Sequence, residues 1–286
     1  MPKSVFQAAE NKGRVETFSY KVEKDGKKFE KQAQVYLPFG YDGADKSIKY
    51  NVVYLMHGGG DDAGSFFSDK RGPLPLTRVL DHLIEDGKMS PIIVVAPTFY
   101  DEPGARGGMQ DAVRQTRDFH LELQDFLIPA LESHYNTHLS GRDRDCIKRS
   151  RAHRAYGGFS MGALSAWYQL AFGLDAAKYI IPLSGDLWVY DENNRKIGAA
   201  EAAQWLGGKI SESEFAGEFK VFAYTGTKDI AYEPQKSLIT SLFELAPLFN
   251  EKNLSFKLKE NGVHYYGDIN EYLYDALPLI WGNRRK

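Results

Sequence analysis

The pentapeptide Gly158-Phe159-Ser160-Met161-Gly162 is the part of the sequence whose residue types and spacing point most directly to chemistry. It matches the pattern G-x-S-x-G, in which a serine lies on a sharp turn between a strand and a helix with its hydroxyl exposed. Side chains at the two glycine positions would collide with the neighbouring strand and helix. We therefore expect Ser160 to be a nucleophile. The alternative is a glycine-rich turn with a surface serine.

A serine hydroxyl is a poor nucleophile near neutral pH and needs an adjacent base, which is normally a histidine. In hydrolases that carry this turn, the chain order is serine, then an acid, then histidine. Among the seven histidines, His264 lies late in the chain on a loop after a predicted strand, so we expect it to be the base. His57 is interpreted as a packing and hydrogen-bonding residue.

Two aspartates between the serine and the histidine are candidates for the acid that orients the imidazole. Asp229 follows the predicted strand 219–224, and Asp186 follows the predicted strand 179–183. The acid usually comes from the strand just before the one that leads to the histidine, which favours Asp229. Asp186 is then expected to line the site beside Trp188, or simply to cap a turn.

Acyl transfer also needs donors for the oxyanion, and two backbone N–H groups usually supply them. The first is expected at Met161, the residue after the nucleophile. The second is expected in the glycine-rich loop that follows His57, at Gly59 or Gly60, and the sequence leaves this choice open. The loop is not interpreted as a phosphate cradle, because no G-K-[ST] follows it.

The elements that must position these residues alternate between strands and helices. Apolar or alternating runs predict the strands, and apolar residues at helical spacing predict the helices between them. This order predicts an α/β fold with a mostly parallel central sheet and helices on both faces, whose ligands bind at the carboxyl ends of the strands. The predicted strands are 32–37, 51–56, 91–96, 155–159, 179–183, 219–224 and 254–259, and the predicted helices are 76–86, 119–134, about 161–172, about 236–245 and about 269–280.

Length and composition narrow the class of protein. The 286 residues admit one domain or two, and no linker or repeat interrupts them. We expect a single domain over residues 1–286, with residues 1–30 forming an N-terminal extension or an edge-strand segment. The net charge of −2 favours neither nucleic acid nor an anionic membrane as a partner. The charged run 142–154 is interpreted as a solvated loop.

No cofactor or metal is expected. Cys146 is the one cysteine, which excludes an intrachain disulfide and a multi-cysteine metal site. His134 and His138 are four residues apart, but no nearby acidic cluster completes a metal site. The N-terminus shows no signal peptide, so we expect either a secreted protein whose leader has been removed or a cytoplasmic protein. The oligomeric state is left open.

Several segments resemble the feruloyl esterases of carbohydrate esterase family 1, a branch of the esterase-D-like α/β hydrolases. The resemblance covers roughly residues 36–281 and implies an α/β-hydrolase fold, with Ser160 as nucleophile, His264 as base and Asp229 as acid. It is carried by YLMHGGGDDAGSFF (54–67), LDHLIEDGKMSPIIVVAPTF (80–99), HRAYGGFSMGALSAWY (153–168), IPLSGDLWVY (181–190), TGTKDIAY (225–232) and INEYLYDALPLIW (269–281).

The resemblance implies a serine carboxylesterase that hydrolyses feruloyl esters of plant cell-wall polysaccharide through an acyl-enzyme. Its substrate would be a small-molecule or oligosaccharide ester, such as a feruloylated arabinoxylan fragment. An acetyl or short-chain acyl esterase, similar to acetylxylan esterases or formylglutathione hydrolases, is the first alternative, and a non-catalytic carbohydrate-binding protein on a hydrolase scaffold is the second. For each aromatic ring alone, ordinary packing is the simpler interpretation. The rings expected near a cinnamoyl group are Phe99, Tyr100, Trp188, Tyr265 and Tyr266.

Overall fold

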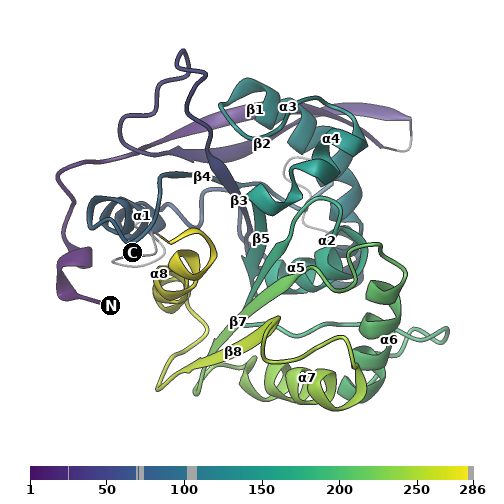
Figure 1. The fold of residues 1–286 in the computed structure, drawn as a ribbon. Coiled ribbons are helices and arrows are strands. Elements are labelled where there is room, and N and C mark those ends of the chain that lie inside the picture. The colour runs from purple at the N-terminus through teal and green to yellow at the C-terminus, as the bar shows by residue number, and fades with distance from the viewer. Residues whose placement is uncertain (25, 69, 71–73, 102–107, 283–286) are drawn as a thin grey trace.

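A single mixed sheet organises the chain (Figure 1). The computed structural model describes residues 1–24, 26–68, 70, 74–101 and 108–282. Within these residues the strand order is β1-β2-β4-β3-β5-β6-β7-β8. The strands are β1 (Arg14–Lys24), β2 (Lys27–Leu37), β3 (Asn51–Met56), β4 (Ile92–Ala96), β5 (Arg154–Phe159), β6 (Tyr179–Leu183), β7 (Lys220–Gly226) and β8 (Leu254–Lys259).

Strands β3 to β8 all run parallel to one another. Strand β2 is antiparallel to both β1 and β4, so β1 forms one edge of the sheet and β8 the other. Parallel strands need long crossover connections, which helices provide. The predicted α/β class with a mostly parallel sheet is confirmed.

Helices cover both faces of the sheet, as predicted (Figure 1). On one face lie α1 (Leu76–Glu85) and α8 (Tyr266–Trp281). The other face is covered by α2 (Met109–Glu122), α3 (Ile128–His134), α5 (Met161–Phe172), α6 (Ala199–Ser211) and α7 (Tyr232–Leu245). Short helices also occur at α4 (Arg144–Arg149), Lys3–Phe6 and Arg151–His153. In the described part of the chain, no helix has the length and apolar character that crossing a membrane requires.

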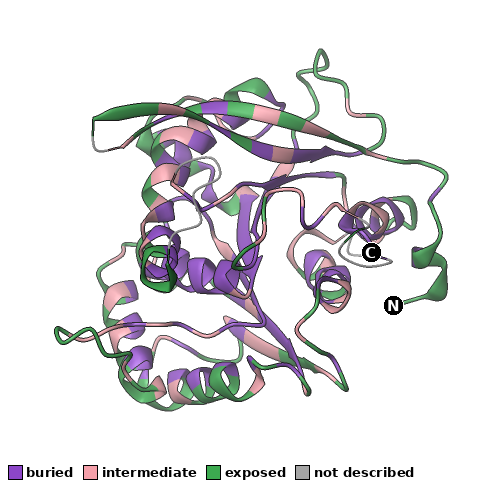
Figure 2. Cartoon of the chain, turned by 180° about the vertical axis from the view of Figure 1, so that it is seen from behind, coloured by how far each residue is buried: buried purple, intermediate pink, exposed green. Residues whose placement is uncertain are grey.

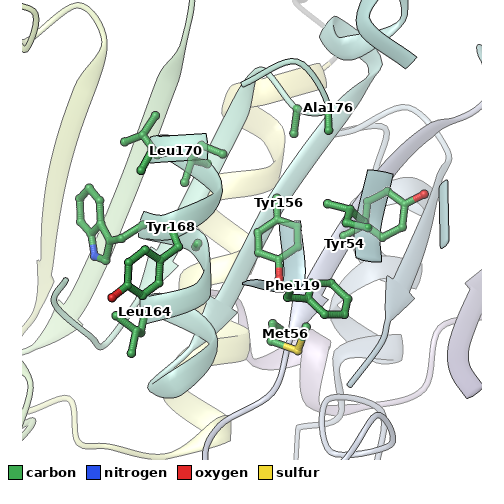
Figure 3. Packing of buried hydrophobic residues seen from close by; sticks show 14 of the residues in the cluster. Tyr54, Met56, Phe119, Tyr156, Leu164, Tyr168, Leu170 and Ala176 are labelled. Carbon is green, nitrogen blue, oxygen red and sulfur yellow. The ribbon is translucent and has the colours of Figure 1, made fainter. Parts of the chain in front are cut away.

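Successive residues of β3 point to opposite faces, as the pleat of a strand dictates. Tyr54 and Met56 enter the larger core, where Figure 3 shows them beside Tyr156 and Phe119. Val53 belongs to the smaller core under α1 and α8. Figure 2 shows that the central strands are buried on both sides, so the core holds the strand ends rigidly in register.

The strands 51–56, 179–183 and 254–259 and the helix 161–172 are confirmed with the predicted bounds. The single helix predicted over 119–134 is wrong in its start and its continuity. Helix α2 begins at Met109, and a π-helical segment, Leu123–Leu127, joins it to α3. Pro129 stands in the first turn of α3. A regular α-helix would bring the proline ring against the carbonyl of Asp125, and the wider π turn accommodates it.

The prediction that 142–154 is a solvated loop is also wrong. Asp143 caps α4 by accepting a hydrogen bond from the Cys146 N–H at 2.8 Å. Arg154 is buried in β5, and its Nη2 donates to Glu132 Oε2 at 2.9 Å. The basic residue is therefore neutralised inside the core by an acid from α3, a pairing that the local sequence does not reveal.

Candidate active site

Ser160 joins β5 to α5 on a strained turn, with φ 57° and ψ −113°. Non-glycine residues rarely adopt positive φ, and such strain is commonly found at functional sites. A Cβ at Gly162 would overlap the carbonyl oxygen of Met56, and a Cβ at Gly158 would lie 2.5 Å from the same oxygen. The crowding predicted for the two glycines of the pentapeptide is therefore present, and it lets the turn approach β3 closely.

His264 and Asp229 meet at the carboxyl end of the sheet. His264 Nδ1 lies 2.7 Å from Asp229 Oδ1, which also accepts a hydrogen bond from the Ala231 N–H at 2.8 Å. Burial raises the pKa of Asp229, but the hydrogen bonds from His264 and the Ala231 N–H outweigh it and hold the pKa below its usual value. An ionised carboxylate can only accept, so the imidazole donates from Nδ1 and keeps an acceptor at Nε2.

The imidazole of His264 lies against Phe159, the residue before the serine, with ring centroids 4.5 Å apart. His264 and Ser160 both face a hollow of about 620 Å³ at the carboxyl ends of the strands. Its apolar wall combines residues from four separate segments, and its polar wall includes Asp186. The apolar lining residues are Met109, Ala112, Met161, Leu164, Trp188, Ile230, Ala231 and Pro234.

A second hollow, of about 330 Å³, adjoins the same residues. It shares Gly59, Ser160 and His264 with the larger hollow. Its remaining lining is different in kind, with two charged side chains and two phenols. These are Gly58, Asp61, Lys70, Phe159, Tyr265 and Tyr266.

Two tyrosine hydroxyls hold the glycine-rich loop after β3. The Gly58 N–H donates to Tyr266 Oη at 3.2 Å, and the Gly60 N–H donates to Tyr100 Oη at 2.8 Å. Within the described residues, the Gly59 N–H makes no hydrogen bond, and Gly59 lines both hollows. Of the two glycines that the sequence left open, Gly59 is thus the one whose N–H remains available to a ligand.

His57 contacts this loop through hydrogen bonds and ring packing. Its interpretation as a packing and hydrogen-bonding residue is confirmed. Its Nδ1 lies 2.7 Å from the carbonyl oxygen of Gly58, and its Nε2 lies 2.8 Å from the hydroxyl of Thr98. Burial lowers the pKa of His57 to about 4, so the ring is neutral at pH 7. Phe99 packs on this imidazole with ring centroids 4.8 Å apart and is only 1% exposed. It lines neither hollow, in contrast to its predicted contact with substrate.

The other two tyrosines predicted near the substrate lie on the side of the smaller hollow. Tyr266 is buried, and besides accepting from Gly58 it donates to Asp61 Oδ2 at 3.0 Å. Tyr265 is 42% exposed at the start of α8. Neither ring reaches the larger hollow, which Trp188 lines.

Asp186 is engaged elsewhere than at the histidine. Its Oδ1 accepts from Trp188 Nε1 at 2.7 Å, and its Oδ2 accepts from Lys196 Nζ at 2.9 Å. The ammonium group of Lys196 also lies 4.7 Å from the centroid of the Trp188 ring. Asp186 and Lys196 therefore fix the orientation of Trp188 in the wall of the larger hollow.

Sequence reasoning missed several residues of the larger hollow, among them Lys196, Met109 and Ile230. Lys196 comes from a polar turn that carries no local signal. Met109 and Ile230 are apolar yet 61% and 78% exposed at the mouth. Ile230 directly follows Asp229, and this adjacency was the one signal that could have identified it.

The amino-acid sequence is similar to those of known proteins. Residues 28–269 match the model of a family described as "Putative esterase". Endo-1,4-beta-xylanase Y of Acetivibrio thermocellus is 38% identical over 257 residues, which is 88% of this chain and 22% of that protein. An endo-1,4-beta-xylanase/feruloyl esterase of Xylanibacter ruminicola is 28% identical over 227 residues, 71% of this chain and 29% of that protein. The chain thus spans less than a third of the length of either curated relative.

Solved structures resemble this one over nearly its whole length. The feruloyl esterase module from Clostridium thermocellum, solved as a mutant complexed with sinapinate, has a TM-score of 0.83 at 34% identity, covering 98% of this chain and 92% of that chain. A CE1 ferulic acid esterase from Anaeromyces mucronatus in complex with ferulic acid has a TM-score of 0.73 at 20% identity, covering 97% and 95%. The second likeness concerns the fold alone. With the sheet topology, these likenesses confirm the predicted α/β-hydrolase fold.

Proposed function

The chain belongs to the esterase family, and from that premise we propose that it is a serine carboxylesterase acting on feruloyl and related hydroxycinnamoyl esters of plant cell-wall polysaccharide. The observation that carries the proposal is the meeting of three groups at one hollow. Ser160 and His264 line it, and Asp229 holds the imidazole from behind.

In the first half of the reaction, the Ser160 hydroxyl attacks the ester carbonyl carbon while His264 Nε2 accepts its proton. The carbonyl oxygen becomes an oxyanion, which the N–H groups of Met161 and Gly59 stabilise. The bond to the alcohol oxygen then breaks, and His264 returns the proton to that oxygen. An acyl-enzyme and a free alcohol result.

In the second half, His264 accepts a proton from water, and the resulting hydroxide attacks the acyl carbon of the acyl-enzyme. The bond to Ser160 Oγ breaks, and the proton passes to that oxygen, which releases the carboxylic acid. Asp229 stays ionised throughout because its pKa is lowered, and it stabilises the imidazolium that forms in each half.

The larger hollow supports a planar aromatic acyl group. Trp188 offers a ring face, while Leu164 and Pro234 add apolar surface. A volume of about 620 Å³ far exceeds what an acetyl group fills, and apolar pockets with few polar groups are the usual design of small-molecule sites. The feruloyl esterase module complexed with sinapinate has the same fold at 34% identity, and it supports the same class of acyl group for this chain.

Hydrolysis of methyl ferulate by the purified chain and its Ser160→Ala variant tests the proposal. We expect the variant to lose about 10³-fold or more in kcat, since the acyl-enzyme can no longer form. Unchanged hydrolysis would refute the assignment of Ser160. An acyl-enzyme trapped from methyl ferulate and seen by intact mass would place the feruloyl group on the chain directly.

An acetyl esterase with incidental feruloyl activity is distinguished by substrate preference. We expect kcat/KM for methyl ferulate to exceed that for an alkyl acetate, because an acetyl group leaves the apolar wall of the larger hollow unfilled. A preference for the acetate would favour the short-chain esterase. Binding of arabinoxylan fragments without turnover of any ester would favour the non-catalytic alternative.

A further inference from the structure

The turn that follows β6 holds a serine in a strained and fully buried position. Ser184 has φ 52°, a backbone conformation that favours glycine, and it is 0% exposed. Its N–H donates to the carbonyl oxygen of Tyr224 in β7 at 2.8 Å. A glycine would relieve the strain, and strained residues of this kind cluster at functional sites. The presence of a serine here therefore points to a role for its hydroxyl group.

Ser184 lies between the nucleophile and the acid in the order of the sheet. Ser160 follows β5, Ser184 follows β6 and Asp229 follows β7, and these three strands are neighbours. The Ser160 N–H donates to the carbonyl oxygen of Leu183 at 3.0 Å. A Cβ at Gly185 would lie 2.8 Å from the carbonyl oxygen of Ser160. The turn after β6 thus packs closely against the turn that carries the nucleophile.

The two oxygens of the Asp229 carboxylate differ in their hydrogen bonds. Oδ1 is paired with His264 Nδ1 and accepts from the Ala231 N–H. In the described part of the chain, Oδ2 is buried and has no hydrogen-bond partner, and the same holds for Ser184 Oγ. A buried polar group without a partner is costly, and nearly all such groups in native proteins are paired. One of these two groups is an acceptor and the other can donate.

The charge state of Asp229 indicates that the two groups are close. Burial raises the pKa of Asp229, whereas His264, the Ala231 N–H and the Ser184 side chain lower it, and the pKa lies below its usual value. A hydroxyl lowers the pKa of a carboxyl by donating to its charged form, which requires proximity. The hydroxyl proton of a serine rotates to suit its acceptor.

We propose that Ser184 is a positioning residue for the catalytic acid, with its hydroxyl donating to Asp229 Oδ2. The inference rests on the proposed function, because it takes Asp229 as the acid that orients His264. Donors from the loop after β8, the start of α7 and the turn after β6 then hold one carboxylate. Its plane is fixed, and so is the direction of the imidazole. The third donor also draws charge from the carboxylate, so the imidazolium of His264 is stabilised less strongly.

Two variants remove the hydroxyl in different backbone contexts. Ser184→Ala keeps a Cβ, whereas Ser184→Gly suits the positive φ, so an effect common to both belongs to the hydroxyl. Thr225→Val is the matched control, because the Thr225 hydroxyl is also fully buried and unpaired within the described residues. Tyr272→Phe removes the other candidate donor. The Tyr272 hydroxyl is likewise unpaired there, and burial, Asp268 and Asp229 raise its pKa.

The first measurement is kcat/KM for methyl ferulate as a function of pH, whose acidic limb reports the base in the free enzyme. We expect both Ser184 variants to move this limb upward by about 0.5 pH unit, because a carboxylate that has lost a donor attracts the imidazolium proton more strongly. Above the limb, kcat falls about tenfold with little change in KM, because the imidazole is oriented less firmly. Thr225→Val and Tyr272→Phe leave the limb in place.

The inference is overturned if the limb keeps its parent position in both Ser184 variants, or if Thr225→Val or Tyr272→Phe moves it as far. Failure of the proposed function is a separate outcome. NMR follows the titration of His264 in the Ser160→Ala protein with and without Ser184→Gly, and this measurement needs no substrate. A parent chain that hydrolyses no ester refutes the function, while an upward shift of the His264 titration in Ser184→Gly still supports the role of Ser184.

Discussion

The imidazole of His264 lies 2.7 Å from the carboxylate of Asp229, although the two residues follow different strands of the sheet. The Asp229 side chain is 0% exposed and that of His264 is 24% exposed, so the acid is enclosed while the base reaches the hollow. Parallel strands β7 and β8 bring their carboxyl ends together, and this register sets the distance. The contact fixes one tautomer of the histidine, with the proton on Nδ1 and an acceptor at Nε2.

Replacement of Asp229 by asparagine is expected to lower kcat on methyl ferulate by about 10³- to 10⁴-fold, with a small change in KM. The amide group is nearly the same size as the carboxylate but can donate to Nδ1, which favours the tautomer that lacks an acceptor at Nε2. Steady-state kinetics of Asp229→Asn measures the effect.

Asp186→Asn is the matched control for that experiment. Asparagine can still accept from Trp188 Nε1, and only the ion pair with Lys196 is lost. We expect a change confined mainly to KM and below about tenfold, since a partly exposed ion pair contributes little. A larger loss of kcat in Asp186→Asn than in Asp229→Asn would reverse the assignment of the acid.

Loss of the Tyr100 hydroxyl should disturb the oxyanion site without touching the serine or the histidine. Tyr100→Phe leaves the Gly60 N–H without its acceptor, so the loop that carries Gly59 loses one of its two tyrosine hydrogen bonds. We expect kcat to fall about tenfold, less than loss of an oxyanion donor itself would cause.

A readout specific to that role is the affinity for a boronic acid that mimics the tetrahedral intermediate, which should fall in parallel with kcat/KM while the affinity for ferulate stays constant. Tyr135→Phe serves as the control, because it removes a tyrosine hydroxyl bonded to Glu16 at 2.6 Å, and Tyr135 lines neither hollow. Equal losses in the two variants would argue for a general effect on stability.

Gly162 should not tolerate any side chain. Because a Cβ there would overlap the backbone carbonyl of Met56, Gly162→Ala is expected to lower the free energy of unfolding by about 3 kcal/mol. Gly208 lies in α6 with open space around it, so Gly208→Ala is expected to raise the same quantity by about 0.5–1 kcal/mol. Urea unfolding of both variants checks the pair, and a Gly162→Ala variant as stable as the parent would contradict the crowding argument.

Acid should destabilise the fold through His57. Burial lowers its pKa to about 4 in the folded state, against about 6.5 in an unfolded chain. Between these values the unfolded state binds the proton more readily, so stability is lost as the pH falls from about 6.5 to about 4, by about 3 kcal/mol in total.

The measurement is urea unfolding of the parent and of His57→Gln at about pH 7 and about pH 4.5. Glutamine does not titrate in this range, so the variant should lose less stability on acidification, whatever its stability at neutral pH. The other histidines are common to both proteins and cancel in the difference. Equal losses would show that His57 takes up no proton on unfolding.

Much of the sheet could be predicted from the sequence, because its buried strands are short apolar runs bounded by polar or glycine-rich turns. Strand β3 is an example, with its bounds at Asn51 and Met56. For residues 1–30 the sequence left open an extension or an edge-strand segment, and it gave no bounds for β1 because Arg14–Lys24 is rich in charged and polar residues. The break between α2 and α3 could not be predicted, because Pro129 can be accommodated in several ways and the sequence alone does not show that a π-helical turn precedes it.

Within the site, chain order and post-strand position led to Ser160, Asp229 and His264 because each lies next to a strand end. The contacts between Gly58 and Tyr266 and between Asp186 and Lys196 could not be predicted in this way. Each contact joins segments that only the folded sheet brings together. The local sequence around one residue of a pair therefore does not predict its partner.

The two edges of the sheet bear on how copies of this protein meet. An uncovered edge strand offers unpaired backbone groups to which another chain's strand can add, and charged side chains along it oppose such addition. Strand β1 exposes Arg14, Lys21 and Glu23, and β8 exposes Lys257. These charged side chains oppose the addition of a strand from a neighbouring copy at either edge. Both borders of the sheet thus discourage its growth into a larger sheet shared between copies.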